Sequence, residues 1–379
     1  MSKFYVIRGE YEPNTAPTNR LLAFVRNFEQ MEIEVELIFL YPNWRKDKLL
    51  INSEYVFVSH LWDRSPIYEK RICAKLLKNS LIAPLKRRIN RGDIVFLSGL
   101  CEDIHLFNRM KGVSVYHEMT EHPDVLLWRL PHWKVRYLNN CKKLAGLFVI
   151  STSLKKYFAN IGVPEDRLHI INMTVDPQRF EGVEKQPTDD KYIAYCGTAS
   201  NNKDGVNRLI EAFAIVAKKH SDVKLYIIGK TPSATDESGN LQLVEALGIK
   251  DRVVFTGVIS AKEMPQMLTN AAVLALARPN NLQAQNGFPT KLGEYLLTDN
   301  PVVVTKVGDI PLFLKDGESA LLSEPDDVEV FADKLCWALE HPVECGEIGK
   351  NGRKVAMANF NASIETNKII DAIFELVRE

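Results

Sequence analysis

The stretch from Asn286 to Asp309 reads N-G-F-P-T-K-L-G-E-Y-L-L-T-D-N-P-V-V-V-T-K-V-G-D. Glycine and proline near its start indicate a loop. Apolar residues at helical spacing then predict a helix over Lys291–Leu297. Pro301 ends that helix, and the valines 302–304 predict a short buried strand. A loop, a helix and a buried strand in this order are typical of α/β domains with a parallel sheet.

The same stretch carries two charged side chains in positions that suit a nucleotide. A helix that begins after a glycine-containing loop gathers unpaired N–H groups and a positive dipole end, which favour a diphosphate. Lys291 lies in the first turn of the predicted helix, where an anion would offset its charge. Glu294 follows one turn later, where a carboxylate can accept two hydrogen bonds from a ribose diol. The alternative interpretation is an ordinary crossover helix with a solvated lysine and glutamate.

Charge is unevenly distributed along the 379 residues, although the net charge is zero. Residues 1–175 hold 26 Lys and Arg against 18 Asp and Glu, whereas residues 176–379 hold 22 against 30. The densest basic part is 65–91, where apolar and basic residues interleave as in an amphipathic helix. Such a helix can lie on an anionic membrane, or it can pack on its own sheet with a solvated basic face. Nucleic-acid binding is not predicted, because no recognised fold or aromatic-basic motif supports it.

The cysteines and the chain start predict a cytoplasmic protein. Six cysteines are scattered without a C-x-x-C pair, which indicates reduced thiols and no bound metal. The first ten residues lack a signal-peptide pattern, and no run of about 18 apolar residues predicts a membrane span. We therefore expect a cytoplasmic location, with the inner face of the membrane as a candidate site of peripheral contact.

Strand-like apolar runs alternate with helical periods throughout, which predicts two successive doubly wound α/β domains with parallel sheets and a cleft between them. Predicted helices of the first half are Arg20–Gln30, Ile67–Asn79 and Ser153–Ile161. Predicted strands are Phe4–Arg8, Val35–Phe39, Tyr55–Ser59, Ile94–Ser98, Val113–His117, Gly146–Ile150, Tyr192–Cys196, Lys224–Ile228, Val253–Phe255, Ala272–Ala275, Val302–Thr305 and Ala320–Leu322. A linker is expected within Ile170–Gln186, and ligands are expected at the carboxyl ends of the strands.

Three further segments accompany the opening stretch in a fixed order. They are I-I-N-M-T-V-D-P-Q-R-F at 170–180, Y-C-G-T-A-S-N-N-K-D-G-V-N-R-L-I-E-A-F at 195–213, and R-V-V-F-T-G-V-I-S at 252–260. Together they resemble glycosyltransferase family 4, and the resemblance extends from about Gly146 to Glu340. It implies the GT-B fold, with two Rossmann-like doubly wound domains that face each other across a cleft. The implied domains are 1–172, which a C-terminal helix near 363–379 rejoins, and 178–362.

The resemblance also implies a donor site in the second domain. Lys203 would contact the donor diphosphate, and Glu294 would hold the ribose. Thr198 stands where the family has an arginine, so we expect Lys291 or Arg278 to supply that charge. Asn286 stands where the family has the first glutamate of an E-x7-E motif. The expected nucleotide and diphosphate contacts are Gly197, Thr198, Lys203, Val258, Arg278, Lys291 and Glu294.

In the first domain the segment V-S-V-Y-H-E-M-T-E-H-P at 113–123 places His117 at a predicted strand end. It matches the family histidine that approaches the donor sugar, although a histidine at a strand end is often structural. The expected catalytic residues are thus His117, Lys203, Asn286 and Glu294. The expected acceptor-side residues are Thr18, Asn19, Arg20, Glu118 and Glu121.

The resemblance implies a retaining hexosyltransferase. It would move a sugar from a nucleotide diphosphate, most readily UDP, to a hydroxyl of a glycan or lipid-linked acceptor in polysaccharide or glycoconjugate biosynthesis. No Asp-x-Asp motif occurs, so no metal is expected. Two alternatives remain open, because Thr198 and Asn286 depart from the family pattern. One is a non-catalytic GT-B scaffold, and the other is a GT-B sugar-nucleotide epimerase.

Overall fold

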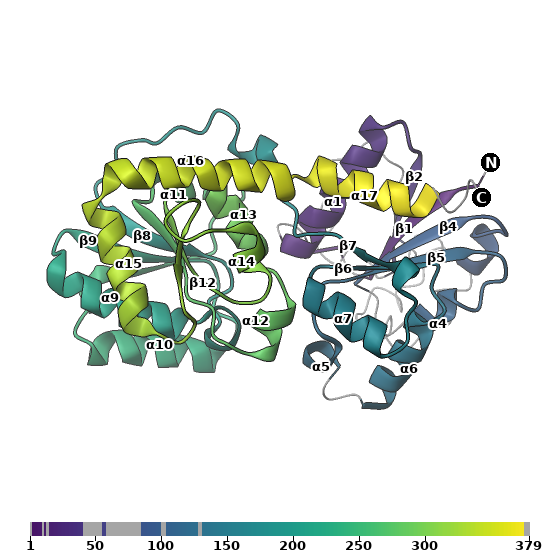
Figure 1. Ribbon diagram of the computed structural model, residues 1–379, viewed down its shortest axis with the longest axis horizontal. Coiled ribbons are helices and arrows are strands. Elements are labelled where there is room, and N and C mark those ends of the chain that lie inside the picture. The colour runs from purple at the N-terminus through teal and green to yellow at the C-terminus, as the bar shows by residue number, and fades with distance from the viewer. Residues whose placement is uncertain are drawn as a thin grey trace. The chain divides into compact units, whose positions relative to one another are not determined.

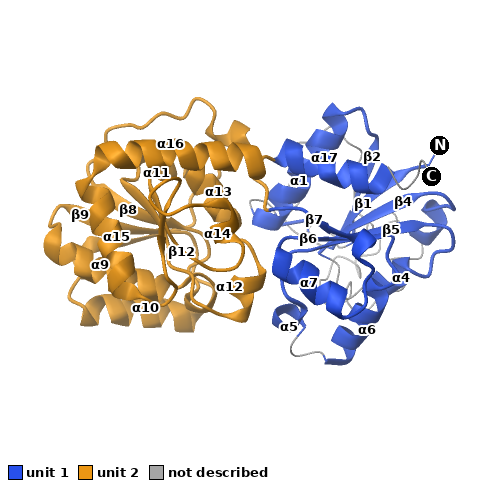
Figure 2. Cartoon of the chain, viewed as in Figure 1, with its two compact units in different colours: residues 1–172, 362–379 blue, residues 173–361 orange. Residues whose placement is uncertain are grey.

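The chain forms two compact units (Figure 2). Unit 1 comprises Met1–Asn172 and Ala362–Glu379, and unit 2 comprises Met173–Asn361. A computed structural model describes residues 2–9, 11–12, 15–40, 55–57, 85–99, 104–127 and 131–374. The first unit therefore takes up both ends of the chain, and the second is one continuous segment.

Unit 1 contains a parallel sheet that is seven-stranded over the described residues (Figure 1). Every neighbouring pair of these strands is parallel. Their order runs outward from β1 in both directions, as in a doubly wound fold. In sheet order the strands are β3 (Tyr55–Phe57), β2 (Val35–Phe39), β1 (Phe4–Arg8), β4 (Ile94–Ser98), β5 (Ser114–Met119), β6 (Gly146–Val149) and β7 (Leu168–Ile170).

The helices of unit 1 include one from each end of the chain. Helix α1 (Ala16–Gln30) packs beside α17 (Ala362–Phe374), so that Phe24 and Phe28 share a buried cluster with Ile369 and Ile373. This shared apolar core explains why the C-terminal helix belongs to the first unit. The other described helices of this unit are α4 (Ile104–Phe107), α5 (Pro123–Leu126), α6 (Pro131–Cys141) and α7 (Thr152–Asn160).

Unit 2 has a second parallel sheet, in the order β10-β9-β8-β11-β12-β13. Its strands are β8 (Lys191–Cys196), β9 (Val223–Ile228), β10 (Val253–Gly257), β11 (Val273–Leu276), β12 (Val302–Thr305) and β13 (Leu321–Ser323). Its helices are α8 (Asn201–Asp204), α9 (Val206–Lys219), α10 (Ala234–Ala246), α11 (Met264–Asn270), α12 (Leu282–Asn286), α13 (Thr290–Leu296), α14 (Ile310–Phe313), α15 (Val328–Glu340) and α16 (Pro342–Asn359). The prediction of two parallel α/β domains is confirmed.

The bounds of some helices and strands differ from the predicted bounds where the sequence pattern was weak. The opening stretch forms α13 and β12, each within one residue of its prediction. Strand β7 was not predicted, and its last residue lies where the linker was expected to begin. The short 3-10 helix η3 (Pro177–Phe180) lies inside that linker. The predicted helix Ile67–Asn79 lies outside the described residues.

The basic segment 65–91 is described only from residue 85 onward. In that part Leu85 and Ile89 are buried, so these apolar side chains pack inward. Arg88 pairs with Glu36, with Nε 2.5 Å from Oε1. Within the described part of the chain, no helix combines the length and the apolar character that crossing a membrane would require.

His117 is a core residue of unit 1, because β5 continues to Met119 instead of ending at the histidine. Its side chain is 0% exposed. Nδ1 lies 3.1 Å from the Leu97 carbonyl, and Nε2 lies 3.1 Å from the Tyr137 hydroxyl. A carbonyl only accepts, so Nδ1 donates to it and the neutral ring accepts from Tyr137 at Nε2. The ring of His117 is thus enclosed and both nitrogens are occupied, and its expected approach to the donor sugar stays a prediction.

Burial makes the stability of unit 1 depend on pH through this ring. Desolvation lowers the pKa of His117 to about 4, against 6.5 for a free histidine. The unfolded chain takes up a proton below pH 6.5 and the folded chain only near pH 4, so stability is lost as the pH falls between these values. Integrated from pH 7 to pH 5, this loss is about 2 kcal/mol.

We therefore predict that His117→Gln makes urea unfolding less sensitive to pH. The stability lost between pH 7 and pH 5 should be smaller by about 2 kcal/mol in this variant than in the wild type. His132→Gln is the control, because His132 is exposed on α6. An unchanged pH dependence in His117→Gln would show that His117 does not titrate as a buried neutral ring.

Candidate functional site

Three glycines shape the carboxyl end of the unit 2 sheet. Gly197 follows β8 with φ 147°, and a Cβ there would lie 2.6 Å from Nζ of Lys291. A Cβ on Gly229, after β9, would lie 2.1 Å from the Gly197 carbonyl oxygen. A Cβ on Gly205 would lie 1.9 Å from the Ala277 carbonyl oxygen, beyond β11. The strand ends approach each other this closely only because these positions lack side chains.

A buried carboxylate lies at the centre of this edge. Asp204 is 3% exposed and ends the short helix α8. Its Oδ2 forms an ion pair with Lys291 and lies 2.8 Å from the Tyr195 hydroxyl. Its Oδ1 lies 3.8 Å from Nε of Arg278. Burial alone would raise the pKa of Asp204, but Lys291 and Arg278 outweigh it and hold that pKa below its usual range.

The cations outnumber this carboxylate. Arg278 is 1% exposed, and its Nε also donates to the Lys203 carbonyl oxygen at 3.2 Å. Lys203 is close enough to Lys291 to lower its pKa, an effect smaller than that of burial and opposed by Asp204. Three cations therefore lie near this one buried carboxylate. Such an excess of positive charge at the carboxyl ends of parallel strands suits an anionic ligand.

Glu294 lies one helical turn after Lys291 on α13 and forms an ion pair with Arg179 of η3. Burial raises the pKa of Glu294, and Arg179 opposes that rise. Gly293 lets the preceding segment pack closely, since a Cβ there would lie 2.5 Å from Met173 Cε and 2.5 Å from Val175 Cγ1. The segment 173–180 therefore packs against α13, and this packing holds Arg179 beside Glu294.

Tyr295 connects α13 to the end of β8. Its hydroxyl accepts from the Cys196 backbone N–H at 2.6 Å and donates to the Cys196 carbonyl at 3.2 Å. Burial, followed by the nearby Glu294 carboxylate, raises the pKa of the Cys196 thiol to about 12. Cys196 therefore stays a protonated thiol at neutral pH and is not a nucleophile.

The structure thus brings together four of the predicted donor-site residues, namely Gly197, Lys203, Arg278 and Lys291, and places Glu294 on the same helix face as Lys291. Tyr195, Asp204 and Arg179 were missed. The adjacent D-G after Lys203 and the arginine directly before Phe180 were the available signals, but neither indicates a partner.

The other predicted donor-site residues are Val258, Asn286 and Thr198, which follows Gly197. Thr198 is exposed, and its carbonyl accepts from the Tyr195 hydroxyl at 2.6 Å. Val258 follows β10 and is 76% exposed. Asn286 ends α12, where its Nδ2 donates to the Leu282 carbonyl at 2.9 Å. None of these contacts places the three side chains in the cluster around Asp204.

The predicted acceptor-side residues of unit 1 are mostly engaged within that unit. Arg20 and Glu118 are buried and form an ion pair with Nε 2.6 Å from Oε1. Arg20 also donates to the carbonyl oxygens of Asn172 at 2.6 Å and Ile171 at 3.1 Å. Thr18 is buried, whereas Asn19 and Glu121 are partly exposed. Arg20, Glu118 and Thr18 are therefore buried within unit 1, and the expected role of these residues as acceptor contacts stays a prediction.

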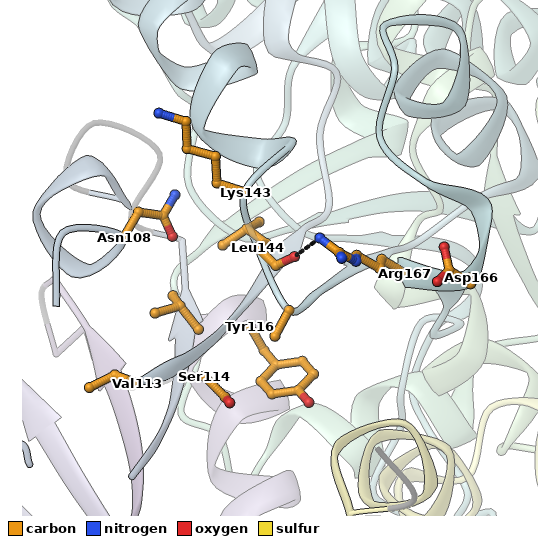
Figure 3. Close-up of a pocket in the computed structure, with 10 residues that line it drawn as sticks. Asn108, Val113, Ser114, Tyr116, Lys143, Leu144, Asp166 and Arg167 are labelled. Atoms are coloured by element: carbon orange, nitrogen blue, oxygen red, sulfur yellow. Dashed lines mark hydrogen bonds between the residues drawn. The ribbon is translucent and has the colours of Figure 1, made fainter. Parts of the chain in front are cut away.

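Two pockets lie at the opposite edges of the sheets. One of about 380 Å³ opens at the amino ends of β5, β6 and β7, where Arg167 Nη1 donates to the Leu144 carbonyl at 3.3 Å (Figure 3). The other, of about 510 Å³, borders the amino ends of β8, β11 and β12 and is lined by Lys185 and Asn300. Ligands of open parallel sheets bind at the carboxyl ends, so neither pocket is the candidate donor site.

A family model described as Glycosyl transferases group 1 matches residues 190–341, within unit 2. The MMP alpha-(1->4)-mannosyltransferase of Mycolicibacterium hassiacum is 27% identical over 263 residues, 65% of this chain and 61% of that protein. The alpha-D-kanosaminyltransferase of Streptomyces kanamyceticus is 23% identical over 279 residues, 68% of this chain and 70% of that protein. The match thus spans less than two thirds of the first of these relatives.

The fold is shared with solved structures over nearly the whole chain. The Anabaena Alr3699/HepE structure in complex with UDP-glucose has a TM-score of 0.76 at 15% sequence identity, covering 99% of this chain and 100% of that one. The family model, the relatives and the common fold agree with the motifs of unit 2. Unit 2 is thus similar to the group 1 glycosyl transferases, and the fold of the chain is that of solved GT-B structures.

Proposed function

We propose that this protein is a retaining glycosyltransferase, which moves a sugar from a nucleotide diphosphate to a hydroxyl of a glycan or lipid-linked acceptor. The observation that carries this proposal is the cluster of Lys203, Lys291 and Arg278 around one buried carboxylate, with Glu294 one turn away on α13. It offers cationic side chains for a diphosphate and a separate carboxylate for a ribose. The transferases named among its relatives support the same reaction class.

We infer that the nucleotide is UDP. The support is indirect: the Anabaena structure of similar fold is a complex with UDP-glucose. The transfer would break the bond between the anomeric carbon and the diphosphate oxygen and form one to the acceptor oxygen on the same face. The acceptor proton would go to the departing phosphate. Glycoconjugate biosynthesis is the process in which such an acceptor occurs.

The proposed roles follow from the charges. Lys203 and Lys291 would stabilise negative charge on the departing diphosphate, since fixed cations cost no reorganisation as the charge develops. Arg278 is enclosed and would act by holding the Lys203 backbone. Glu294 would accept the ribose hydroxyls while Arg179 keeps it ionised. These cations supply the charge that a metal ion provides in other transferases, so we propose a reaction without a metal.

One prediction for the proposed donor site concerns Lys203. Lys203→Ala should lower turnover by about 10²- to 10³-fold, because one donor of transition-state stabilisation is lost. A thermal-shift titration with UDP, GDP, ADP and their sugar conjugates should show a selective shift for the wild type that this variant loses. Lys262→Ala, an exposed lysine before α11, is the matched control. No shift with any nucleotide would favour the non-catalytic scaffold instead.

The second prediction concerns the ionisation of Glu294. Because burial raises its pKa, nucleotide affinity should fall as the pH is lowered, starting above the usual range of a glutamate. Arg179→Ala removes the charge that opposes this rise, so the loss should move to higher pH. Glu294→Gln should bind more weakly at every pH and lack this component. Dissociation constants for UDP between pH 5 and 8 measure all three, and overlapping profiles would refute the assigned role.

A further inference from the structure

The pocket of about 510 Å³ in unit 2 lies at the edge of the sheet opposite to the proposed donor site. It is bordered by the amino ends of β8, β11 and β12, by the segment 185–188, and by the end of α15 and the start of α16. A volume of this size accommodates a small metabolite. None of its lining residues belongs to the cluster around Asp204, so a molecule bound here would be a second ligand.

Four charged residues line this pocket, and three of them already have a partner of opposite charge. Asp190 pairs with Lys224 at 2.8 Å, Lys191 with Asp222 at 3.7 Å and Asp299 with Arg353 at 3.7 Å. Lys185 is the fourth. Burial alone lowers the pKa of its ammonium, and among the described residues no carboxylate opposes that shift. The pocket therefore contains one ammonium group without a counter-ion.

The ammonium of Lys185 is held in position by neutral groups, although the residue as a whole is exposed. Its Nζ donates to the Ala271 carbonyl at 3.0 Å and to Asn300 Oδ1 at 3.3 Å. Asn300 is itself fixed, because it is 7% exposed and its Nδ2 donates to the carbonyls of Leu268 and Thr269, both at 2.9 Å. An ammonium carries three N–H donors, so these bonds leave one for a ligand.

A second donor belongs to Asn270, which also lines the pocket. Its Oδ1 accepts from the Gln186 backbone N–H at 2.9 Å and from Gln266 Nε2 at 2.8 Å. These two donors fix the orientation of the amide, because its NH2 group has no acceptor to offer them. In the part of the chain that the structure describes, neither N–H of its Nδ2 has an acceptor. The pocket thus presents an ammonium donor and an amide donor.

A purely structural role would account for part of this arrangement. Helix α11 ends at Asn270, and a lysine near the end of a helix interacts favourably with its last carbonyl groups. Capping explains the bond from Lys185 to the Ala271 carbonyl. It leaves the third N–H of the ammonium, the Nδ2 donors of Asn270 and the open volume beside them without a function.

We propose that this pocket binds a small metabolite that carries a carboxylate, which the ammonium of Lys185 and the amide of Asn270 recognise. One ammonium balances one carboxylate, whereas a phosphate monoester carries close to two negative charges at neutral pH. Charge-assisted hydrogen bonds of this kind are stronger than those between neutral groups. Pro301, Leu339 and Pro342 line other parts of the pocket and suit an uncharged, partly apolar body of the ligand.

The test is a titration of the full chain with sodium butyrate, followed by ligand-detected NMR with the ionic strength held constant by sodium chloride. Butyrate should bind. Butyramide, a neutral molecule of nearly the same size, should bind about 10- to 100-fold more weakly, because it lacks the charge-assisted hydrogen bond. Lys185→Gln should weaken butyrate binding by a similar factor, about 10- to 100-fold.

Two further variants separate binding from folding. Asn270→Asp keeps an oxygen that accepts from Gln186 and Gln266 but replaces the amide donor by a carboxylate, so the fold should persist and butyrate binding should be lost. Lys191→Gln is the matched control, because it removes a lysine of the same pocket that already pairs with Asp222. This control should change butyrate binding by less than about twofold.

Several results would overturn the proposal. They are no butyrate binding, equal binding of butyramide, unchanged binding in Lys185→Gln and Asn270→Asp, or an equal loss in Lys191→Gln. Binding of inorganic phosphate in place of butyrate would refute the carboxylate as the recognised group. The proposal does not depend on glycosyl transfer: Lys203→Ala should lose the nucleotide thermal shift and retain butyrate binding, and Lys185→Gln should show the reverse.

Discussion

The buried carboxylate of Asp204 is the constraint on which the unit 2 site depends. A lone buried charge costs several kcal/mol, so this carboxylate is tolerable only with its partners in place. Those partners come from the end of β8, from beyond β11 and from α13. Asp204 therefore fixes three separate segments to one point. Gly197 and Gly205 allow the backbones to come close enough for these bonds to form.

This arrangement also decides how the site can receive an anion. Lys291 is partly neutralised by Asp204, which lowers its attraction for a diphosphate but holds its side chain in one position. A preorganised cation contributes more to charge stabilisation than a mobile one, because it need not reorient as charge develops. Lys291 on α13 and Arg278 after β11 bring two cations to the edge of the sheet where Thr198 lies.

The sequence predicts the helices and strands that carry this site better than it predicts which side chains pair with each other. Apolar runs and prolines mark strands and helices locally, so α13 and β12 are placed within one residue. The bond between Lys291 and Asp204 joins residues 87 apart, and that between Arg179 and Glu294 joins residues 115 apart. No local spacing encodes such pairs. These pairs form because the ends of parallel strands meet at one edge of the sheet. The topology therefore predicts the edge at which they lie, but not the direction of each side chain.

Unit 1 offers a comparison, because polar residues of α1 and β5 were expected to contact the acceptor there. Arg20 and Glu118 form a buried pair of one cation with one carboxylate, whereas three cations lie near Asp204 in unit 2. The net charge of each half of the chain would have suggested an anion site in the first half instead, because residues 1–175 are basic and residues 176–379 are acidic. Attraction for a bound phosphate depends on the charges within a few ångströms, because more distant surface charges are screened. The local count of cations and carboxylates therefore distinguishes a pair that stabilises the fold from a cluster that can receive a ligand.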